Sequence, residues 1–241
     1  MAINVNTVYQ TVLMILNQEQ RGYMTPTEFN KVATQVQLEI FEKYFDDLNQ
    51  QLRIPQADTD YADRQENIDE KIAIFKTFGN PTYVSTGTLN YFSLPTVDAY
   101  GETVDFYRLG TVVYKNTNQI QRLDRSEFYY VDRSRLTKPT EINPIYLYEN
   151  NKLFIKPTSI ASNVSVDYIR KPKNVVWGFT PGGLGQYVFT ETASTNFELH
   201  ESEQSEVILK ILLYSGIIIR DPQVVQTAAA LVQADETNKK S

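Results

Sequence analysis

The chain has 241 residues, of which 41% are hydrophobic and 22% charged, enough to build the core of one large domain or of two small ones. It contains no cysteine and one histidine, which excludes disulfide frameworks, thiolate metal sites and multi-histidine metal sites. The formal net charge of −6 argues against a general affinity for nucleic acid or for anionic membranes.

Two amphipathic helices are predicted at the start of the chain, over residues 5–20 and 25–52. The second should begin with a capping box, in which Thr25 and Glu28 exchange hydrogen bonds while Pro26 occupies the first helical position. Its apolar residues recur at steps of three and four, which is typical of a helix that packs one face on a core. Because the connection between the helices is short, we expect them to pack as a helical hairpin.

A third helix is predicted over residues 61–78, and it should end at Gly79. Residues 58–70 contain six Asp or Glu against Arg64, a sum of −5. Such a run is usually the solvated face of a helix, but it could also meet a basic stretch on a neighbouring copy of the chain.

From residue 83 onward the apolar residues alternate with a period of two, which predicts strands. The clearest pair flanks Asn150 and Asn151, because asparagine tolerates the positive φ of a tight hairpin turn. Asp124 should cap a short helix between the strands. The candidate strands cover residues 83–86, 88–94, 103–108, 111–115, 143–149, 152–156, 163–170 and 185–189.

Helical spacing returns over residues 201–219, and Asp221 followed by Pro222 should begin a last helix. Its apolar face consists of small side chains, so we expect it to be held weakly on its own subunit and to become ordered on a neighbour. That face consists of Val224, Val225, Ala228, Leu231 and Val232.

The order of the elements predicts an α+β fold with an N-terminal helical bundle, a central antiparallel β block of sandwich or barrel type, and C-terminal helices. We assign residues 1–80 to the N-terminal helical part and 81–198 to the β-rich part. Residues 199–241 should form C-terminal helices that pack on the N-terminal ones, with a flexible tail from about residue 236.

No motif predicts catalysis, a metal or a cofactor. His200 and Glu201 begin like a zinc-protease motif, but no second histidine follows four residues later. The glycines at 182, 183 and 185 do not fit a phosphate-binding loop, and we interpret that stretch as a turn.

Four carboxylates cluster just before and within the start of the helix predicted over 201–219. A glycoside hydrolase uses two such groups as acid and base. Acidic side chains also favour the N-terminal end of a helix, because the helix dipole attracts them there. The second interpretation explains the cluster without any chemistry. The four residues are Glu198, Glu201, Glu203 and Glu206.

The stretch from residue 122 to residue 138 mixes aromatic side chains with five Lys or Arg and three Asp or Glu, a sum of +2. It resembles a nucleic-acid patch in miniature, but at so low a charge we favour a solvated or subunit-facing surface. The 16 Tyr and 12 Phe of the chain fit an aromatic β core or interface surfaces equally well. Beside the last helix, the candidate interface residues are Tyr23, Arg125, Tyr129, Arg133 and Arg135.

Three segments carry a resemblance to a known group of proteins. They are residues 8–49 (VYQTVLMILNQEQRGYMTPTEFNKVATQVQLEIFEKYFDDLN), 167–178 (DYIRKPKNVVWG) and 197–222 (FELHESEQSEVILKILLYSGIIIRDP). They resemble virion structural proteins of tailed bacteriophages, in particular of crAss-like and related podovirus-type phages. The order of helices, β block and helices is also similar to that of the podovirus adaptor family called tail tubular protein A or head-completion protein.

The resemblance implies a ring, commonly twelvefold, that lies under the portal protein at the head–tail junction of the virion and is assembled in the host cytoplasm. Its implied partners are further copies of the chain, the portal, other tail or ring proteins, and genomic DNA that passes through the bore without sequence-specific binding. It implies no membrane partner, no cofactor and no catalytic residues. The alternative is a carbohydrate-binding or glycan-hydrolysing tail component, with the β block as its binding module.

Overall fold

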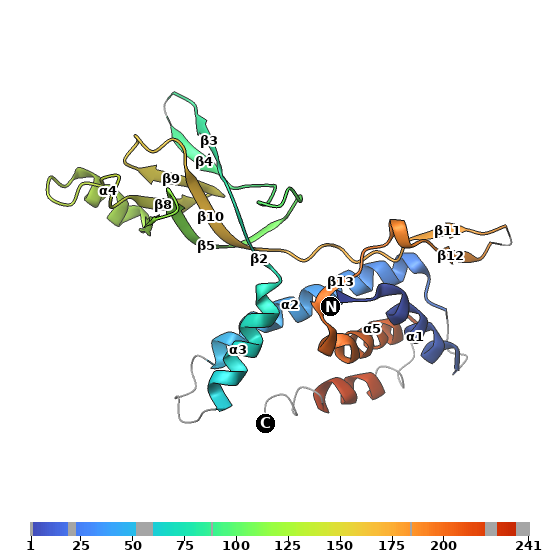
Figure 1. Ribbon diagram of the computed structural model, residues 1–241. Coiled ribbons are helices and arrows are strands. Elements are labelled where there is room, and N and C mark those ends of the chain that lie inside the picture. Colours follow the sequence, from blue (N-terminus) through green and yellow to red (C-terminus); the bar gives the residue numbers. More distant parts are fainter. Residues whose placement is uncertain are drawn as a thin grey trace. The chain divides into compact units, whose positions relative to one another are not determined.

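The computed structural model describes residues 2–18, 23–51, 60–87, 89–183, 185–219 and 226–234 (Figure 1). Helices and mostly antiparallel sheets confirm the predicted α+β class. The chain forms two compact units. We call Met1–Ile74 with Pro172–Ser241 the helical unit, and Phe75–Lys171 the β unit.

The described residues of the helical unit form α-helices and two-stranded sheets. Its helices are α1 (Val5–Gln18), α2 (Pro26–Gln51), α3 (Asp60–Ala73) and α5 (Gln204–Ile219), with the 3-10 turns η1 (Glu191–Ala193) and η2 (Glu201–Glu203). Its strands are β1 (Ala2–Ile3), which pairs antiparallel with β13 (Phe197–His200), and β11 (Phe179–Pro181), which pairs antiparallel with β12 (Tyr187–Phe189). Residues 226–234 are also helical.

The core of the helical unit forms where α5 packs against both α1 and α2. An aromatic group joins α1, α2 and the chain that leads to β11. The ring centroid of Tyr9 lies 4.8 Å from that of Phe29 and 4.4 Å from that of Trp177. The helices predicted over 5–20 and 25–52 are confirmed as α1 and α2, except for residues 19, 20 and 52, which lie outside the described residues.

The predicted capping box begins α2. The backbone N–H of Thr25 donates to Glu28 Oε2 at 2.9 Å, and the N–H of Glu28 donates to Thr25 Oγ1 at 3.4 Å. The Thr25 hydroxyl also donates to the Glu28 carboxylate, and this bond, followed by the backbone bond, lowers the pKa of Glu28. Local sequence therefore fixes where this helix starts.

A row of polar side chains on α2, which we call the polar ladder, binds the extended segment 173–177. Asn30 accepts from the backbone N–H of Trp177 at 2.7 Å and donates to its carbonyl at 3.3 Å. The Thr34 hydroxyl accepts from the backbone N–H of Val175 at 3.2 Å and donates to its carbonyl at 3.4 Å. Gln37, only 1% exposed, donates to another carbonyl of the segment at 2.7 Å. Because the three side chains are spaced by one turn, the helix satisfies backbone groups that a neighbouring strand would otherwise pair.

The β unit consists of two sheets, with strand orders β2-β10-β5-β6 and β3-β4-β9-β8-β7. Its strand pairs are antiparallel apart from β7 with β8. Side chains from both sheets share one core, as in a β-sandwich. The elements are β2 (Lys76–Gly79), β3 (Thr82–Ser85), β4 (Asn90–Ser93), β5 (Phe106–Tyr114), β6 (Asn118–Gln119), β7 (Gln121–Arg122), α4 (Arg125–Arg133), β8 (Ile145–Glu149), β9 (Lys152–Lys156) and β10 (Val164–Arg170).

The clearest predicted hairpin is confirmed as β8 and β9. Asn150 and Asn151 adopt φ values of 51° and 55°, the left-handed conformation that this tight turn requires. The turn pairs Glu149 with Lys152 and sets the register of the whole hairpin.

The predicted helix over 61–78 is wrong at its end. The structure ends α3 at Ala73, and Lys76–Gly79 form β2. This segment pairs antiparallel with β10, and that pairing between residues distant in the sequence overrides the helical spacing.

The two strands predicted over 103–108 and 111–115 are a single strand, β5. It passes through Gly110, at which a Cβ would lie 2.8 Å from the carbonyl oxygen of Asp167 on β10. This glycine therefore permits close approach of two backbones and does not mark a break in the strand.

The first and last strands of the β unit bring its two ends together. β2 pairs with β10 from Lys76 opposite Ile169 to Gly79 opposite Val166. The backbone N–H of Arg170 donates to the carbonyl of Phe75 at 2.9 Å. The chain therefore enters and leaves the β unit at neighbouring points.

Candidate functional site

The structure separates the four clustered carboxylates into different environments. Glu203 and Glu206 are buried, with 2% and 4% of their surface exposed. Glu201 is exposed at the start of η2. Glu198, on β13, accepts from the backbone N–H of Lys173 at 2.9 Å. Glu203 and Glu206 therefore do not form an acid–base pair that is open to solvent.

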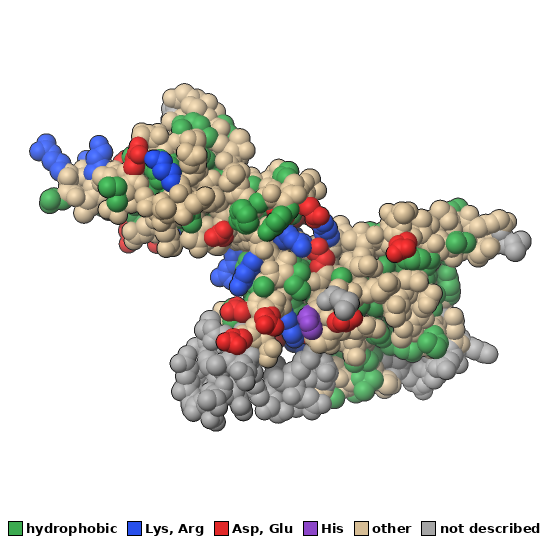
Figure 2. Space-filling model, in the orientation of Figure 1, with side chains coloured by type: hydrophobic (Ala, Val, Ile, Leu, Met, Phe, Trp, Pro, Cys, Tyr) green, Lys and Arg blue, Asp and Glu red, His purple; other side chains and the backbone are tan. Residues whose placement is uncertain are grey.

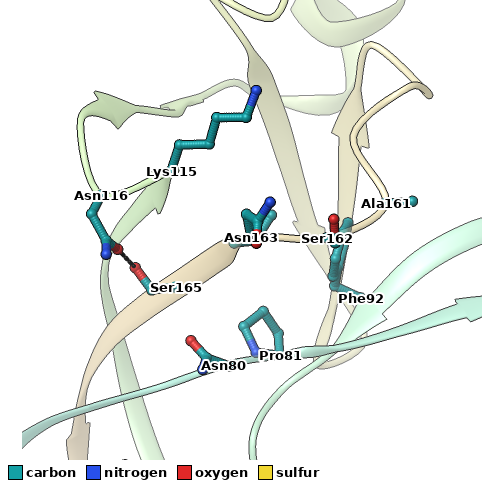
Figure 3. A pocket seen from close by; sticks show the side chains of 10 residues that line it. Asn80, Pro81, Phe92, Lys115, Asn116, Ala161, Ser162, Asn163 and Ser165 are labelled. Atoms are coloured by element: carbon teal, nitrogen blue, oxygen red, sulfur yellow. Dashed lines mark hydrogen bonds between the residues drawn. The ribbon is translucent and has the colours of Figure 1, made fainter.

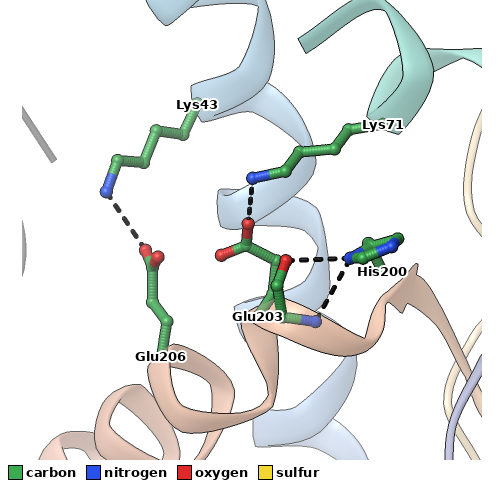
Figure 4. Close-up of polar contacts among 6 residues, drawn as sticks. Lys43, Lys71, His200, Glu203 and Glu206 are labelled. Atoms are coloured by element: carbon green, nitrogen blue, oxygen red, sulfur yellow. Dashed lines mark hydrogen bonds and ion pairs between the residues drawn. The ribbon is translucent and has the colours of Figure 1, made fainter. Parts of the chain in front are cut away.

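The two buried carboxylates form ion pairs that join three helices (Figure 4). Lys71 of α3 binds Glu203, and the Nζ atom of Lys43 on α2 lies 3.1 Å from Glu206 Oε1. Lys210, one turn after Glu206 on α5, adds a contact of 3.5 Å. The two acids hold α2, α3 and the start of α5 together. Their lysine partners come from distant parts of the sequence, so the sequence alone does not reveal this role.

The single histidine caps the turn that leads into α5. The Nδ1 atom of His200 accepts from the backbone N–H of Ser202 at 3.2 Å, and the side chain is exposed (Figure 4). Among the described residues, no group of three or more His, Cys, Asp or Glu side chains is placed to hold a metal ion.

Replacing Lys71 with methionine should lower the free energy of unfolding by about 2–3 kcal/mol, because it leaves the buried Glu203 carboxylate without this cation. The value lies at the lower end of the range for buried pairs because the Lys71 side chain is 28% exposed. Urea denaturation would measure the loss. The second substitution Glu203→Gln should recover most of it, and failure to recover would show that the charge pair is not the cause.

Several exposed apolar side chains of the β unit lie on α4 and the loop after it. Phe128 anchors α4 in a small core with Ile145 and Leu147 of β8. The outer side chains point away from this core, and 78% of Tyr130 and 98% of Leu136 are exposed. We call this region the α4 surface, and it consists of Tyr129, Tyr130, Arg133, Arg135, Leu136, Lys138 and Ile142.

The charged groups of α4 and its neighbouring strands include ion pairs as well as exposed cations of the α4 surface. Arg125 lies 3.4 Å from Glu149, and Lys156 lies 3.3 Å from Asp132, so these groups tie α4 to the β8–β9 hairpin. Arg133 and Arg135 are exposed at the end of the helix and in the loop. Lys and Arg side chains gather at the end of the β unit that carries α4 (Figure 2).

The other predicted interface residues are distributed over the helical unit. Tyr23 is 53% exposed, immediately before α2. In the helical segment 226–234, Ala228 is buried and Leu231 is 48% exposed. Val224, Val225, the predicted start of this helix at Asp221 and the predicted flexible tail lie outside the described residues.

A polar cavity of about 600 Å³ opens at one end of the β-sandwich (Figure 3). Two turns with positive φ form its rim, at Lys115 and Asn116 and at Asn163, and the Lys115 N–H donates to the Asn163 carbonyl at 2.9 Å. Phe92 contributes an apolar wall. A hydrogen bond with Tyr114 raises the pKa of Lys115 above its ordinary value. The amides and hydroxyls that line the cavity suit an uncharged polar ligand.

Sequence reasoning missed both the cavity and the apolar part of the α4 surface. The cavity arises from turns that only the folded sheets bring together. Leu136 and Ile142 are aliphatic and would ordinarily be assigned to a core. A usable signal was their position in a stretch rich in Arg, Lys and Thr, which lacks strand or helix periodicity.

No protein-family model matches the chain, and no curated protein matches its sequence. None of the helices in the described part of the chain has both the length and the apolar character required to span a membrane.

Proposed function

We propose that the protein is a structural ring or adaptor component of a phage virion, at the junction between the portal and the tail, with DNA passing through the ring. The α4 surface is the observation that carries this proposal. It combines Tyr130, Leu136 and Ile142, each at least 75% exposed, with Arg133 and Arg135. Tyrosine and arginine are enriched among the few residues that supply most of the binding energy of protein interfaces, and apolar patches rimmed by polar residues mark interaction sites.

The ion-pair cluster also supports a structural role for the helical unit. Two of the four carboxylates that the alternative hypothesis would use as acid and base, Glu203 and Glu206, are buried and bound by Lys71 and Lys43. Their contacts stabilise the packing of α2, α3 and α5, which suits a unit that bears load within an assembly.

The decisive experiment is to count the chain in purified particles of the phage that encodes it. Quantitative mass spectrometry should give a fixed, simple ratio between the copy numbers of this chain and of the portal protein. Electron cryomicroscopy should place the chain at the head–tail junction. Particles made with the Tyr130→Asp variant should contain much less of the chain. Tyr100→Asp is the matched control, because Tyr100 is 79% exposed and Tyr130 is 78% exposed on the same unit. Absence of the wild-type chain from particles would refute the proposal.

The cavity of the β unit favours a second candidate function, carbohydrate binding by the β unit of a tail component. Its Asn116 and Ser165 side chains, which bond each other at 3.5 Å, resemble groups that bind sugar hydroxyls (Figure 3). Calorimetric titration with a panel of bacterial surface glycans tests this function, with Asn116→Ala as the variant that should lose binding. If the wild-type protein binds none of these glycans, carbohydrate binding by the β unit is not supported.

A further inference from the structure

The α4 surface combines basic and apolar side chains. Arg133 closes α4 and Arg135 follows two residues later, while Lys138 adds a third exposed cation. Two acidic side chains lie in α4, and one of them, Asp132, is already paired with Lys156. In the sequence, the exposed Leu136 follows Arg135 directly, and the exposed Ile142 follows Lys138 by four residues. The surface therefore suits a partner that offers carboxylates beside an apolar side chain.

One face of α3 offers this combination on the helical unit. Glu66 and Glu70 are exposed and lie one turn apart on the helix. Ile74 follows four residues after Glu70, just beyond the end of α3, and 44% of it is exposed. We call Glu66, Glu70 and Ile74 the α3 face. Lys71 does not cancel its charge, because its ammonium group is bound to Glu203.

We infer that the α4 surface of one copy binds the α3 face of the next copy. This inference rests on the proposed ring function and names the contact through which the ring forms. Two different patches meet, so the contact is heterologous, and repetition of such a contact closes into a ring when the rotation allows. Arginine side chains of the one patch meet carboxylates of the other, while Leu136 and Ile142 cover Ile74.

A protein partner accounts for the α4 surface better than nucleic acid does. Phosphate groups are bound by cations and hydrogen-bond donors, and they gain nothing from aliphatic side chains that are almost fully exposed. The net charge of −6 also opposes binding of a polyanion to the chain as a whole.

Charge reversal with rescue in trans tests the contact. One variant carries Arg133→Glu and Arg135→Glu, and the other carries Glu66→Lys and Glu70→Lys. Each alone should weaken self-association by about 100-fold or more in sedimentation velocity, because like charges face each other. An equimolar mixture of the two should restore assembly, as should a chain with all four substitutions. The control for the α3 variant is Glu191→Lys with Glu201→Lys. It makes the same change of charge as Glu66→Lys with Glu70→Lys, but at exposed positions elsewhere on the helical unit, and it should assemble normally.

The outcomes separate this contact from the proposed function. If the single-patch variants dissociate and their mixture stays dissociated, the two patches do not bind each other between copies, and the inference is wrong. The inference is also wrong if wild-type chains do not associate, or if Arg133→Glu with Arg135→Glu abolishes salt-dependent binding to duplex DNA and leaves self-association intact. None of these results alters the copy number in virions, on which the proposed function depends. Circular dichroism confirms that each variant is folded.

Discussion

Replacing Phe29 with alanine should lower the free energy of unfolding by about 3–5 kcal/mol, the range for deleting a fully buried phenylalanine ring. Phe29 is wholly buried on α2 and contacts Tyr9, which in turn packs against Trp177. The loss includes the cavity that remains beside the Tyr9 ring. Urea denaturation followed by fluorescence would measure the loss, and Trp177 is the only tryptophan in the chain.

Leu153→Ala is the matched variant in the other unit. Leu153 is fully buried in the β-sandwich core, and its truncation should cost about 2–5 kcal/mol. Hydrogen exchange should show that Phe29→Ala exposes amides of α1, α2 and α5, whereas Leu153→Ala exposes amides of β4, β8 and β9. A loss below about 1 kcal/mol for Phe29→Ala would contradict the tight packing described for the helical core.

Stability should fall steeply as the pH rises above 10. Burial raises the pKa of Tyr9 and of Tyr44 well above the value of 10.0 for a free tyrosine. The unfolded chain therefore releases these protons first, so their contribution is fully present below pH 10 and is lost as the pH rises. Each of the two lowers the free energy of unfolding by about 1.4 kcal/mol per pH unit in this range.

Tyr214 should contribute in the window between pH 10 and 12. Its hydroxyl donates to the Glu39 carboxylate, and this bond, more than burial, raises the pKa of Tyr214 to about 12. Thermal melts between pH 8 and 12, together with tyrosinate absorbance, would follow the loss. A melting temperature that does not change over this range would show that the tyrosines titrate alike in the folded and unfolded chains.

Tyr44→Phe provides the control for the alkaline effect. The Tyr44 hydroxyl is buried and has no hydrogen-bond partner among the described residues. Removing it should raise stability at neutral pH by about 1 kcal/mol, because an unsatisfied buried polar group is deleted. It should also reduce the slope above pH 10. The ring still faces Lys71, whose Nζ lies 5.7 Å from its centroid.

The features that follow from neighbouring residues could be predicted from the sequence. The capping box at Thr25, the hairpin turn at Asn150 and the alternation of helical and β segments depend on local chemistry, and each is confirmed. The strand at Lys76–Gly79 could not be predicted, because its partner β10 lies about ninety residues later. For the same reason the polar ladder on α2 was not foreseen. In the sequence Asn30 and Gln37 interrupt an apolar stripe, and only the segment 173–177 reveals their role.

The candidate site could be predicted only in part. The sequence predicted Tyr129, Arg133 and Arg135 as interface residues, and the structure shows them at the surface. The exposure of their neighbour Leu136 could not be predicted, because the exposure of an aliphatic side chain depends on the path of the loop in the fold. Likewise, the carboxylates at 203 and 206 could not be recognised as ion-pair partners without the fold that brings Lys71 and Lys43 to them.

The pairing of β2 with β10 makes the β unit a removable module. Its entry at Phe75 and its exit at Arg170 are joined by a backbone hydrogen bond, so a short glycine-containing linker can replace the whole sandwich without pulling the remaining chain apart. Recombination could exchange such a module between related chains, because its two ends are distant in the sequence but neighbours in the fold. The helical unit would then keep its polar ladder and ion pairs, while the surface offered by the inserted sandwich changes with each exchange.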